Sequence, residues 1–241
     1  MAVILEVTNL HKHFGGIHVT RHVNFSMQEG EQSAIIGPNG AGKSTFMNLL
    51  TGYHRSDLGR VVFEGRDITN RPPHEIARMG ISRAFQVSSI FVKMTVAENV
   101  RSSVHAQMRR SFSIFGAARR IGMEETGRVL ALCGLEGKRD LVAGELAQGD
   151  KKRLELAIAL AGKPRLLFLD EPTAGMSIEE ARSTMELVDR LNRDLQLTVL
   201  FTEHDMGIVF NHARKLTLMH RGEIVVQGTP AEVRANEIAQ K

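Results

Sequence analysis

The chain is poor in cysteine and in long apolar runs, and it contains no tryptophan. Cys133 is the only cysteine among 241 residues, so no disulfide can form within the chain. Its apolar neighbours predict a small buried side chain rather than a reactive thiol. No run of about 18 apolar residues is present, so we expect no membrane-spanning helix. The first residues lack the basic region and the apolar stretch of a signal peptide, and we expect a cytosolic protein.

The net charge and the histidine content exclude fewer classes of function than the missing residues do. The net charge is +4, and the ten histidines show no paired metal-ligand spacing. Residues 101–120 contain five arginines and no acidic residue, which is typical of a solvated helix face but also suits a membrane surface or a membrane partner. Phe112 and Phe115 lie in that segment and leave a nucleic-acid partner open. The single tyrosine, Tyr53, and the lack of tryptophan argue against stacked single strands, so no nucleic acid is expected.

Residues 37–45 fit the phosphate-binding pattern of a glycine, four residues, a second glycine, a lysine, and a serine or threonine. A buried strand is predicted before the motif at 33–36, and a helix after it at 46–50. Backbone N–H groups and the helix N-terminus of such a loop bind phosphate oxygens. Lys43 is expected to reach the outer phosphates, and Ser44 to contact Mg²⁺. The predicted binding residues are Gly37, Pro38, Asn39, Gly40, Ala41, Gly42, Lys43, Ser44 and Thr45.

Short apolar runs separated by helical patterns favour an α/β fold. Strands are predicted at residues 4–7, 33–36, 61–63, 166–169, 199–201, 216–219 and 223–226. The middle of the chain, from about 87 to 162, has helical patterning and few strand signals. We therefore expect a mostly helical subdomain inserted into an α/β core.

A second candidate site element is the apolar run 166–169, which ends in Asp170 and Glu171. A continuous apolar run suits a strand that is covered on both faces. Carboxylates at its end would lie at the edge where open α/β sheets bind ligands. We expect Asp170 to hold Mg²⁺ through water, and Glu171 to polarise the attacking water in phosphoryl transfer. An acidic helix start is the alternative for this pair alone.

Together these residues resemble the ATP-binding subunit of ABC transporters along nearly the whole chain. Residues 146–150 stand where that family has its signature segment, directly before a helix predicted at 151–161. The resemblance implies that Gln86 senses the metal and the membrane partner, that His204 lies near the γ-phosphate, and that Phe14 stacks on adenine. It further implies that the signature residues Ala147, Gln148 and Gly149 bind nucleotide.

The resemblance is closest to subunits of importers for branched-chain amino acids, amides and urea, and is carried by residues 14–16, 94–100, 153–157 and 228–236. It implies a single domain over 1–241: a P-loop ATPase core with an antiparallel β subdomain and an inserted helical subdomain at about 87–162. ATP and Mg²⁺ are the implied cofactors. The implied partners are a second ATP-binding subunit in a homodimer or heterodimer, transmembrane permease subunits and, indirectly, a solute-binding protein. The implied location is the cytoplasmic face of the membrane.

Departures from the family pattern leave alternatives open. Ala147 lacks the hydroxyl that would bind a γ-phosphate, and Ser177 replaces an aspartate of the dimer contact, which suits a non-identical partner. The chain stops at Lys241, earlier than is usual, so a short or truncated tail is expected. An ATPase of a lipid or lipopolysaccharide exporter, an ABC ATPase of DNA repair or translation, and a regulator without turnover are the alternatives. Glu171 and His204 argue against the last of these.

Overall fold

The computed structural model describes residues 2–84, 90–107 and 116–236. The strands are β1 (Val3–Phe14), β2 (Ile17–Gln28), β3 (Gln32–Ile36), β4 (Leu58–Phe63), β5 (Arg66–Asp67), β6 (Ile81–Ala84), β7 (Leu166–Asp170), β8 (Thr198–Thr202), β9 (Lys215–His220) and β10 (Glu223–Gly228). The helices are α1 (Lys43–Leu50), α2 (Pro73–Arg78), α3 (Val96–Gln107), α4 (Gly116–Leu132), α5 (Gln148–Ala161), α6 (Ile178–Leu195), α7 (Met206–His212) and α8 (Pro230–Ala235), with 3₁₀ turns at Glu136–Lys138 and Ala143–Glu145.

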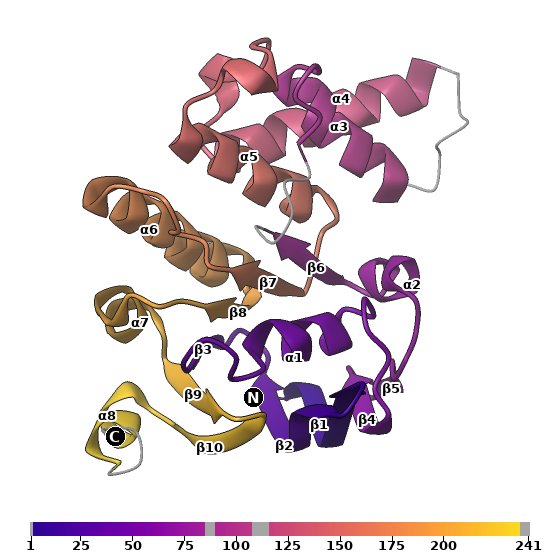
Figure 1. Ribbon diagram of the computed structural model, residues 1–241. Helices are drawn as coiled ribbons and strands as arrows, with labels where there is room; N and C mark the ends of the chain where they lie inside the picture. Colours follow the sequence, from indigo (N-terminus) through magenta and orange to yellow (C-terminus); the bar gives the residue numbers. More distant parts are fainter. Residues whose placement is uncertain (1, 85–89, 108–115, 237–241) are drawn as a thin grey trace.

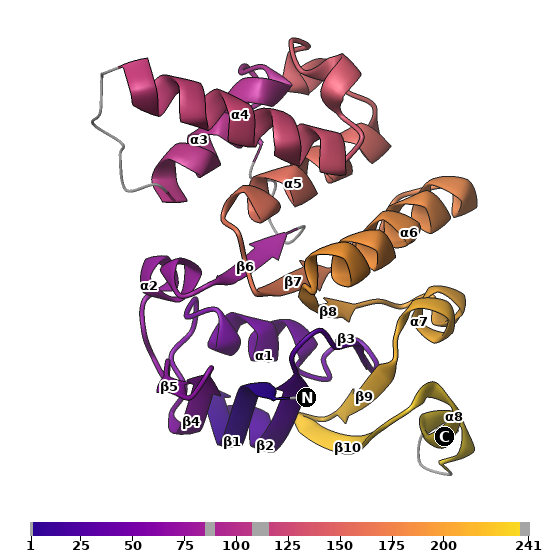
Figure 2. The same ribbon diagram turned by 180° about the vertical axis from the view of Figure 1, so that it is seen from behind.

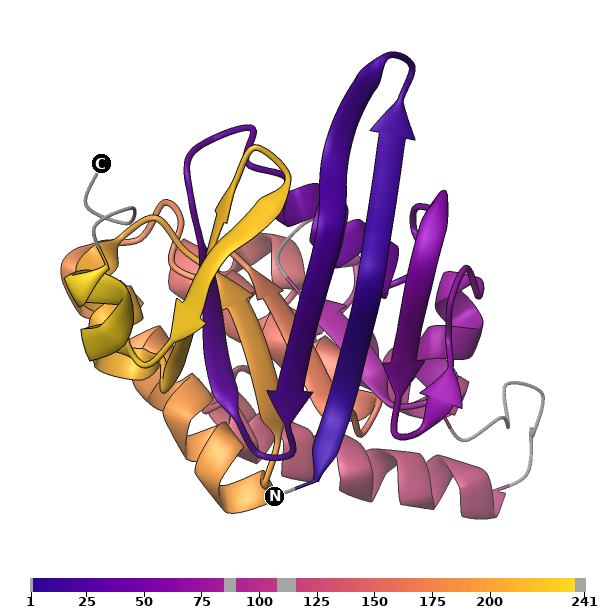
Figure 3. The same ribbon diagram turned by 90° about the horizontal axis from the view of Figure 1, so that it is seen from below.

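The strands form two sheets that face each other. One sheet is antiparallel, with the order β2-β1-β4-β5, and the other has the order β10-β9-β3-β8-β7-β6. Strands β9, β3, β8, β7 and β6 are parallel, and β10 pairs antiparallel with β9. Figure 3 shows the long β1–β2 hairpin lying across the strands of the second sheet. The parallel strands bring their carboxyl ends to one edge.

The central strands bury both of their faces. In β7, Leu166 and Phe168 belong to the core between the sheets, whereas Leu167 and Leu169 belong to the core under the helices. Because side chains alternate along a strand, a run of four apolar residues fills both cores at once. All four of these side chains are fully buried. The acidic residues that follow them are therefore anchored from two sides.

Helix α1 lies between the two sheets, as Figure 1 shows. Its side chains Phe46, Met47 and Leu50 are fully buried in the same cluster as strands β1, β2 and β4. Phe46 meets Phe25 of β2 edge to face at a centroid distance of 5.5 Å. The loop that precedes α1 is thus held by a helix embedded in the core.

Helices α3, α4 and α5 pack together on the other side of the six-stranded sheet, and Figures 1 and 2 agree on this arrangement. The apolar residues Val100, Leu130 and Leu154, one from each helix, share one core cluster with the sheet. Cys133 follows α4 with 1% of its surface exposed, and burial raises the pKa of its thiol to about 12. The prediction of a buried cysteine is confirmed. Within the described ranges, no helix has the length and apolar character needed to cross a bilayer.

The predicted fold class is confirmed, and each predicted strand lies within or overlaps an observed one. Three strands were missed, namely β2, β5 and β6, of which β5 has only two residues. Strand β2 alternates apolar residues such as Val23 and Phe25 with histidine, arginine and asparagine, so its polar face hid the strand. Strand β6 has only four residues, and its central pair is Ser82 and Arg83.

Candidate functional site

The phosphate-binding motif forms a loop between β3 and α1. Gly37 has a φ of 146°, and a Cβ atom there would lie 2.1 Å from the carbonyl oxygen of Met219, so only glycine fits. Helix α1 begins at Lys43, and its N-cap, Gly42, has no side chain that could bind the first N–H groups. Those donors and the helix dipole are therefore available to an anion.

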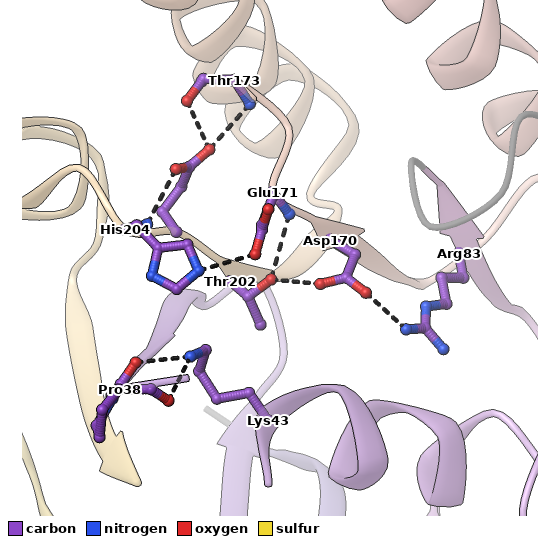
Figure 4. A network of polar contacts seen from close by, with 10 residues as sticks. Pro38, Lys43, Arg83, Asp170, Glu171, Thr173, Thr202 and His204 are labelled. Carbon is purple, nitrogen blue, oxygen red and sulfur yellow. Dashed lines mark hydrogen bonds and ion pairs between the residues drawn. The ribbon is translucent and has the colours of Figure 1, made fainter. Parts of the chain in front are cut away.

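Lys43 folds back over this loop. Its Nζ atom donates to the carbonyl oxygens of Gly37 at 2.6 Å and Pro38 at 3.1 Å, as Figure 4 shows. Burial lowers the pKa of Lys43, and the charges of Glu171 and Asp170 oppose that shift. The ammonium group is thus buried among carbonyls and within the field of two carboxylates. Ser44, the next residue, is exposed.

Asp170 and Glu171 stand at the carboxyl end of β7, as the sequence predicts. Asp170 pairs with Thr202 across the parallel register, and its Oδ1 atom accepts a hydrogen bond of 2.6 Å from the Thr202 hydroxyl. Glu171 has a φ of 51°, which is uncommon for a residue with a side chain. Its backbone N–H is held by the carbonyl oxygen of Thr202 at 3.1 Å and the Thr202 hydroxyl at 3.2 Å. Thr202 therefore fixes both acidic residues.

His204 meets Glu171 at the surface of the site. The Nε2 atom of His204 lies 2.8 Å from Oε1 of Glu171, and both side chains are nearly half exposed. A carboxylate can only accept, so this contact requires the proton on Nε2 of the imidazole. Figure 4 places this pair above Lys43. The structure therefore brings four of the predicted residues, Lys43, Asp170, Glu171 and His204, to one edge of the sheet.

Several residues of this site escaped the sequence analysis. Arg83, inside β6, donates from Nη2 to Oδ2 of Asp170 at 2.8 Å and from Nη1 to Oδ1 of Asn48 at 2.5 Å. Only 7% of its side chain is exposed. Glu203, between Thr202 and His204, is also buried. For Glu203, the available signal was a charged residue directly after the apolar run that forms β8.

The remaining predicted residues lie elsewhere. Phe14 ends β1 with 42% of its surface exposed, and its ring meets His54 at a centroid distance of 5.1 Å. Ala147 is the N-cap of α5, and Gln148 and Gly149 begin that helix. A Cβ atom on Gly149 would lie 3.3 Å from Oε1 of Glu180, so this segment faces the first turn of α6 rather than the loop before α1.

Ser177, which replaces the expected aspartate, has a structural role. It is the N-cap of α6, where its hydroxyl accepts from the backbone N–H of Glu180 and the Glu180 carboxylate binds the backbone N–H of Ser177. Gln86 lies in 85–89, outside the described residues. Phe112 and Phe115, with most of the arginines of 101–120, are likewise outside them or in the part of α4 whose side chains are not described.

The donor set suits a hard divalent cation that is shared with phosphate. Within the described residues, no group of three or more His, Cys, Asp or Glu side chains is arranged to hold a metal ion. Mg²⁺ does not need such a cage, because it is bound through one or two protein oxygens together with substrate phosphates and water. The hydroxyl of Ser44 and the carboxylate of Asp170 offer oxygen atoms of the kind that such a cation would take.

Comparisons with known proteins agree with this geometry. A family model described as "ABC transporter" matches residues 20–174. The high-affinity branched-chain amino acid transport ATP-binding protein BraF of Pseudomonas aeruginosa is 35% identical over 240 residues, covering 97% of this chain and 94% of that protein. The probable branched-chain amino acid transport ATP-binding protein LivG of Archaeoglobus fulgidus is 36% identical over 237 residues, with 97% and 92% covered.

Solved structures match equally well. A nucleotide-free ATP-binding cassette from an ABC transporter superposes with a TM-score of 0.88 at 31% identity, covering 100% of this chain and 98% of that chain. The ADP conformation of an ATP-binding cassette of an ABC transporter gives a TM-score of 0.86 at 33% identity, with 96% of this chain and 93% of that chain covered. These comparisons cover 96–100% of the chain, including the phosphate loop, the acidic end of β7 and His204. The chain therefore belongs to the ABC transporter family, in which it is an ATP-binding subunit with ATPase activity.

Proposed function

We propose that this chain powers the import of branched-chain amino acids or related small solutes, as one of two ATP-binding subunits that close around MgATP. The observation that carries the proposal is the meeting of Lys43, Asp170, Glu171 and His204 at the edge of the sheet beside the phosphate loop. The names of the similar proteins support the substrate class.

In this proposal the residues of the phosphate loop bind the nucleotide. Lys43 exchanges its two carbonyl acceptors for phosphate oxygens, and backbone N–H groups of 37–45 bind the rest of the phosphate chain. Ser44 and Asp170 hold Mg²⁺, which when bound offsets the negative charge of the phosphates. Phe14 packs on the adenine base. The segment 147–149 of a second subunit contacts the γ-phosphate from the opposite side.

Glu171 and His204 act in hydrolysis. The Glu171 carboxylate accepts a hydrogen bond from the attacking water and so orients and polarises it. Phosphoryl transfer depends mainly on such positioning and on charge. His204 binds Glu171 through Nε2 at 2.8 Å and so fixes the direction of its carboxylate. Gln86 is proposed to report metal occupancy to the membrane partner.

The partners and the location belong to the same proposal. A homodimer or heterodimer of ATP-binding subunits would sit on transmembrane permease subunits at the cytoplasmic face of the membrane, and a solute-binding protein would deliver the substrate to the permease. The helical subdomain at about 87–162 is the proposed docking element within a single domain over 1–241. Recovery of a permease from detergent-solubilised membranes with this chain as bait tests this part.

Glu171→Gln tests the assignment of the hydrolytic residue. This variant is expected to retain MgATP, accumulate an ATP-bound dimer and lose turnover, because the amide cannot draw a proton from water. Size-exclusion chromatography with ATP and a phosphate-release assay measure the two effects. Glu186→Gln, an exposed change on α6, is the matched control. Turnover of Glu171→Gln at the parent rate would assign the role to another residue.

A further inference from the structure

The two loops that carry Glu171 and His204 are joined by a buried carboxylate. Strands β7 and β8 are parallel neighbours, and Asp170 is in register with Thr202. The chain beyond each strand end therefore runs side by side, with Glu171 on one loop and Glu203 on the other. Glu203 turns inward, and only 5% of its surface is exposed.

Both oxygens of Glu203 are used. Oε1 accepts a hydrogen bond of 2.9 Å from the backbone N–H of Thr173 and one of 2.6 Å from its hydroxyl. Oε2 accepts one of 3.1 Å from the backbone N–H of His204. Figure 4 shows these bonds ending at Thr173 above and at His204 below. One carboxylate thus ties the loop after β7 to the loop after β8.

A buried carboxylate such as that of Glu203 needs hydrogen-bond donors for both of its oxygens. A buried carboxylate is costly unless donors replace its water, and three donors do so here. Two hydrogen bonds fix the loop after β7. The backbone N–H of Glu171 donates to the Thr202 hydroxyl, and the backbone N–H of Thr173, two residues later, donates to Glu203. Glu171 therefore lies between two hydrogen-bonded contacts, which maintain its unusual backbone φ of 51°.

We propose that Glu203 is a positioning residue that sets Glu171 and His204 in contact, so that the two act as one unit. The inference rests on the hydrolytic roles proposed above for that pair. Glu203 touches neither nucleotide nor water in this account. It acts by fixing the backbone of His204 on one side and the backbone after Glu171 on the other, and the 2.8 Å contact between the two side chains follows from those anchors.

Glu203→Gln tests the inference with a change of nearly the same shape. The amide has one oxygen, which can serve Thr173, but its NH₂ group then faces the backbone N–H of His204, so two donors oppose each other. We expect the kcat of ATP hydrolysis to fall about 10- to 100-fold, the range for a catalytic group displaced by a fraction of an ångström to about 1 Å. The KM for ATP is expected to change less than about threefold, because the phosphate loop is untouched.

A second readout reports the geometry without turnover. Nitrogen-15 NMR of the imidazoles, assigned with His204→Gln, gives the tautomer of His204. In the parent chain the contact with Glu171 predicts the Nε2-protonated tautomer, and in Glu203→Gln we expect a mixture of both tautomers. Asp205→Asn is the matched control: it removes a neighbouring charge from the same loop, while asparagine can still cap α7. Parental turnover and tautomer are expected for it.

Thr173→Val keeps the inference testable if Glu203→Gln does not fold. It removes the hydroxyl donor at 2.6 Å and keeps the shape and the backbone N–H, so a smaller loss in the same direction is expected. Parental kcat and an unchanged tautomer in the folded variant would overturn the positioning role, provided that Glu171→Gln abolishes turnover. If Glu171→Gln itself hydrolyses ATP normally, the proposed hydrolytic role fails instead, and the tautomer of His204 still tests whether Glu203 sets the contact.

Discussion

At the scale of single residues, the site depends on side chains that hold other side chains. Asp170 has one oxygen on the Thr202 hydroxyl and the other on the guanidinium of Arg83. The proposed metal ligand is thus oriented before any cation arrives. Arg83 also reaches Asn48 of α1, so it links the helix behind the phosphate loop to the acidic strand end.

Arg83→Met is expected to destabilise the fold. The change leaves Asp170, with 11% of its side chain exposed, without its charged partner, and breaking a buried pair costs about 3–5 kcal/mol. Urea unfolding measures the loss. Arg60→Met breaks the exposed pair with Asp67 and is expected to cost less than about 1 kcal/mol. Asp170→Asn combined with Arg83→Met should cost less than the sum of the two single changes. Equal losses at Arg83 and Arg60 would contradict the buried pair.

Phe14→Ala is expected to weaken the binding of ATP by about 1–3 kcal/mol, the usual range for base–aromatic stacking. Calorimetry with ATP and with tripolyphosphate separates the base from the phosphates, and only ATP should be affected. Ile17→Ala is the control, because Ile17 pairs with Phe14 across the hairpin and is also exposed. An equal loss for both ligands would make Phe14 structural.

At the scale of elements, the β1–β2 hairpin carries a histidine cluster. Nδ1 of His11 lies 3.1 Å from Nε2 of His18, and the ring of His11 meets that of His22 edge to face at 4.3 Å. Burial is the largest cause that lowers the pKa of both His11 and His18, and neighbouring positive charges from histidines and Arg21 add to it. Asp57, whose pKa is lowered to about 2 by its hydrogen bond to Lys12, opposes the shift at His11.

The hairpin is therefore expected to lose stability in mild acid. A histidine whose folded pKa is below its unfolded value of about 6.5 binds more protons when unfolded, so stability is full above about pH 6.5 and falls as the pH drops below it. Thermal unfolding at about pH 7.5 and about pH 5.5 measures the difference. His11→Gln should reduce this difference, whereas His74→Gln, on exposed α2, should leave it unchanged. A parent Tm that rises on acidification across this range would contradict the prediction.

The elements also show how far the sequence could lead. Runs that bury both faces, such as β7 and β8, were predictable, because every residue in them is apolar or at the strand end. Strand β2 was not, because most of its side chains are polar and apolar residues such as Val23 and Phe25 are separated by polar ones. The roles of Arg83 and Glu203 depend on parallel neighbours from distant parts of the chain. The glycine pattern predicted the phosphate loop, but the partners of Asp170 and His204 required the register of the sheet.

At the scale of the whole molecule, nucleotide binding and folding are linked. MgATP at about 100 times its Kd is expected to stabilise the chain by about 2.7 kcal/mol. Lys43→Ala removes a charge-assisted contact of about 1.5–3 kcal/mol, so at the same nucleotide concentration most of this stabilisation should disappear. Unfolding curves with and without MgATP measure it. Lys163→Ala, which removes the exposed partner of the ion pair with Glu125, should keep the full effect. Equal stabilisation of both variants would separate Lys43 from the nucleotide.

The burial of Lys43 has a consequence for selection on this fold. Because burial lowers its pKa, the folded chain carries an ammonium group that would be better solvated in the unfolded chain. That cost is met during folding, so the arriving phosphate does not have to desolvate the group again. The affinity for phosphate is therefore higher, and the stability of the folded chain without nucleotide is lower. A methionine at this position would make the fold more stable but unable to bind phosphate through this side chain, so only selection for activity retains the lysine.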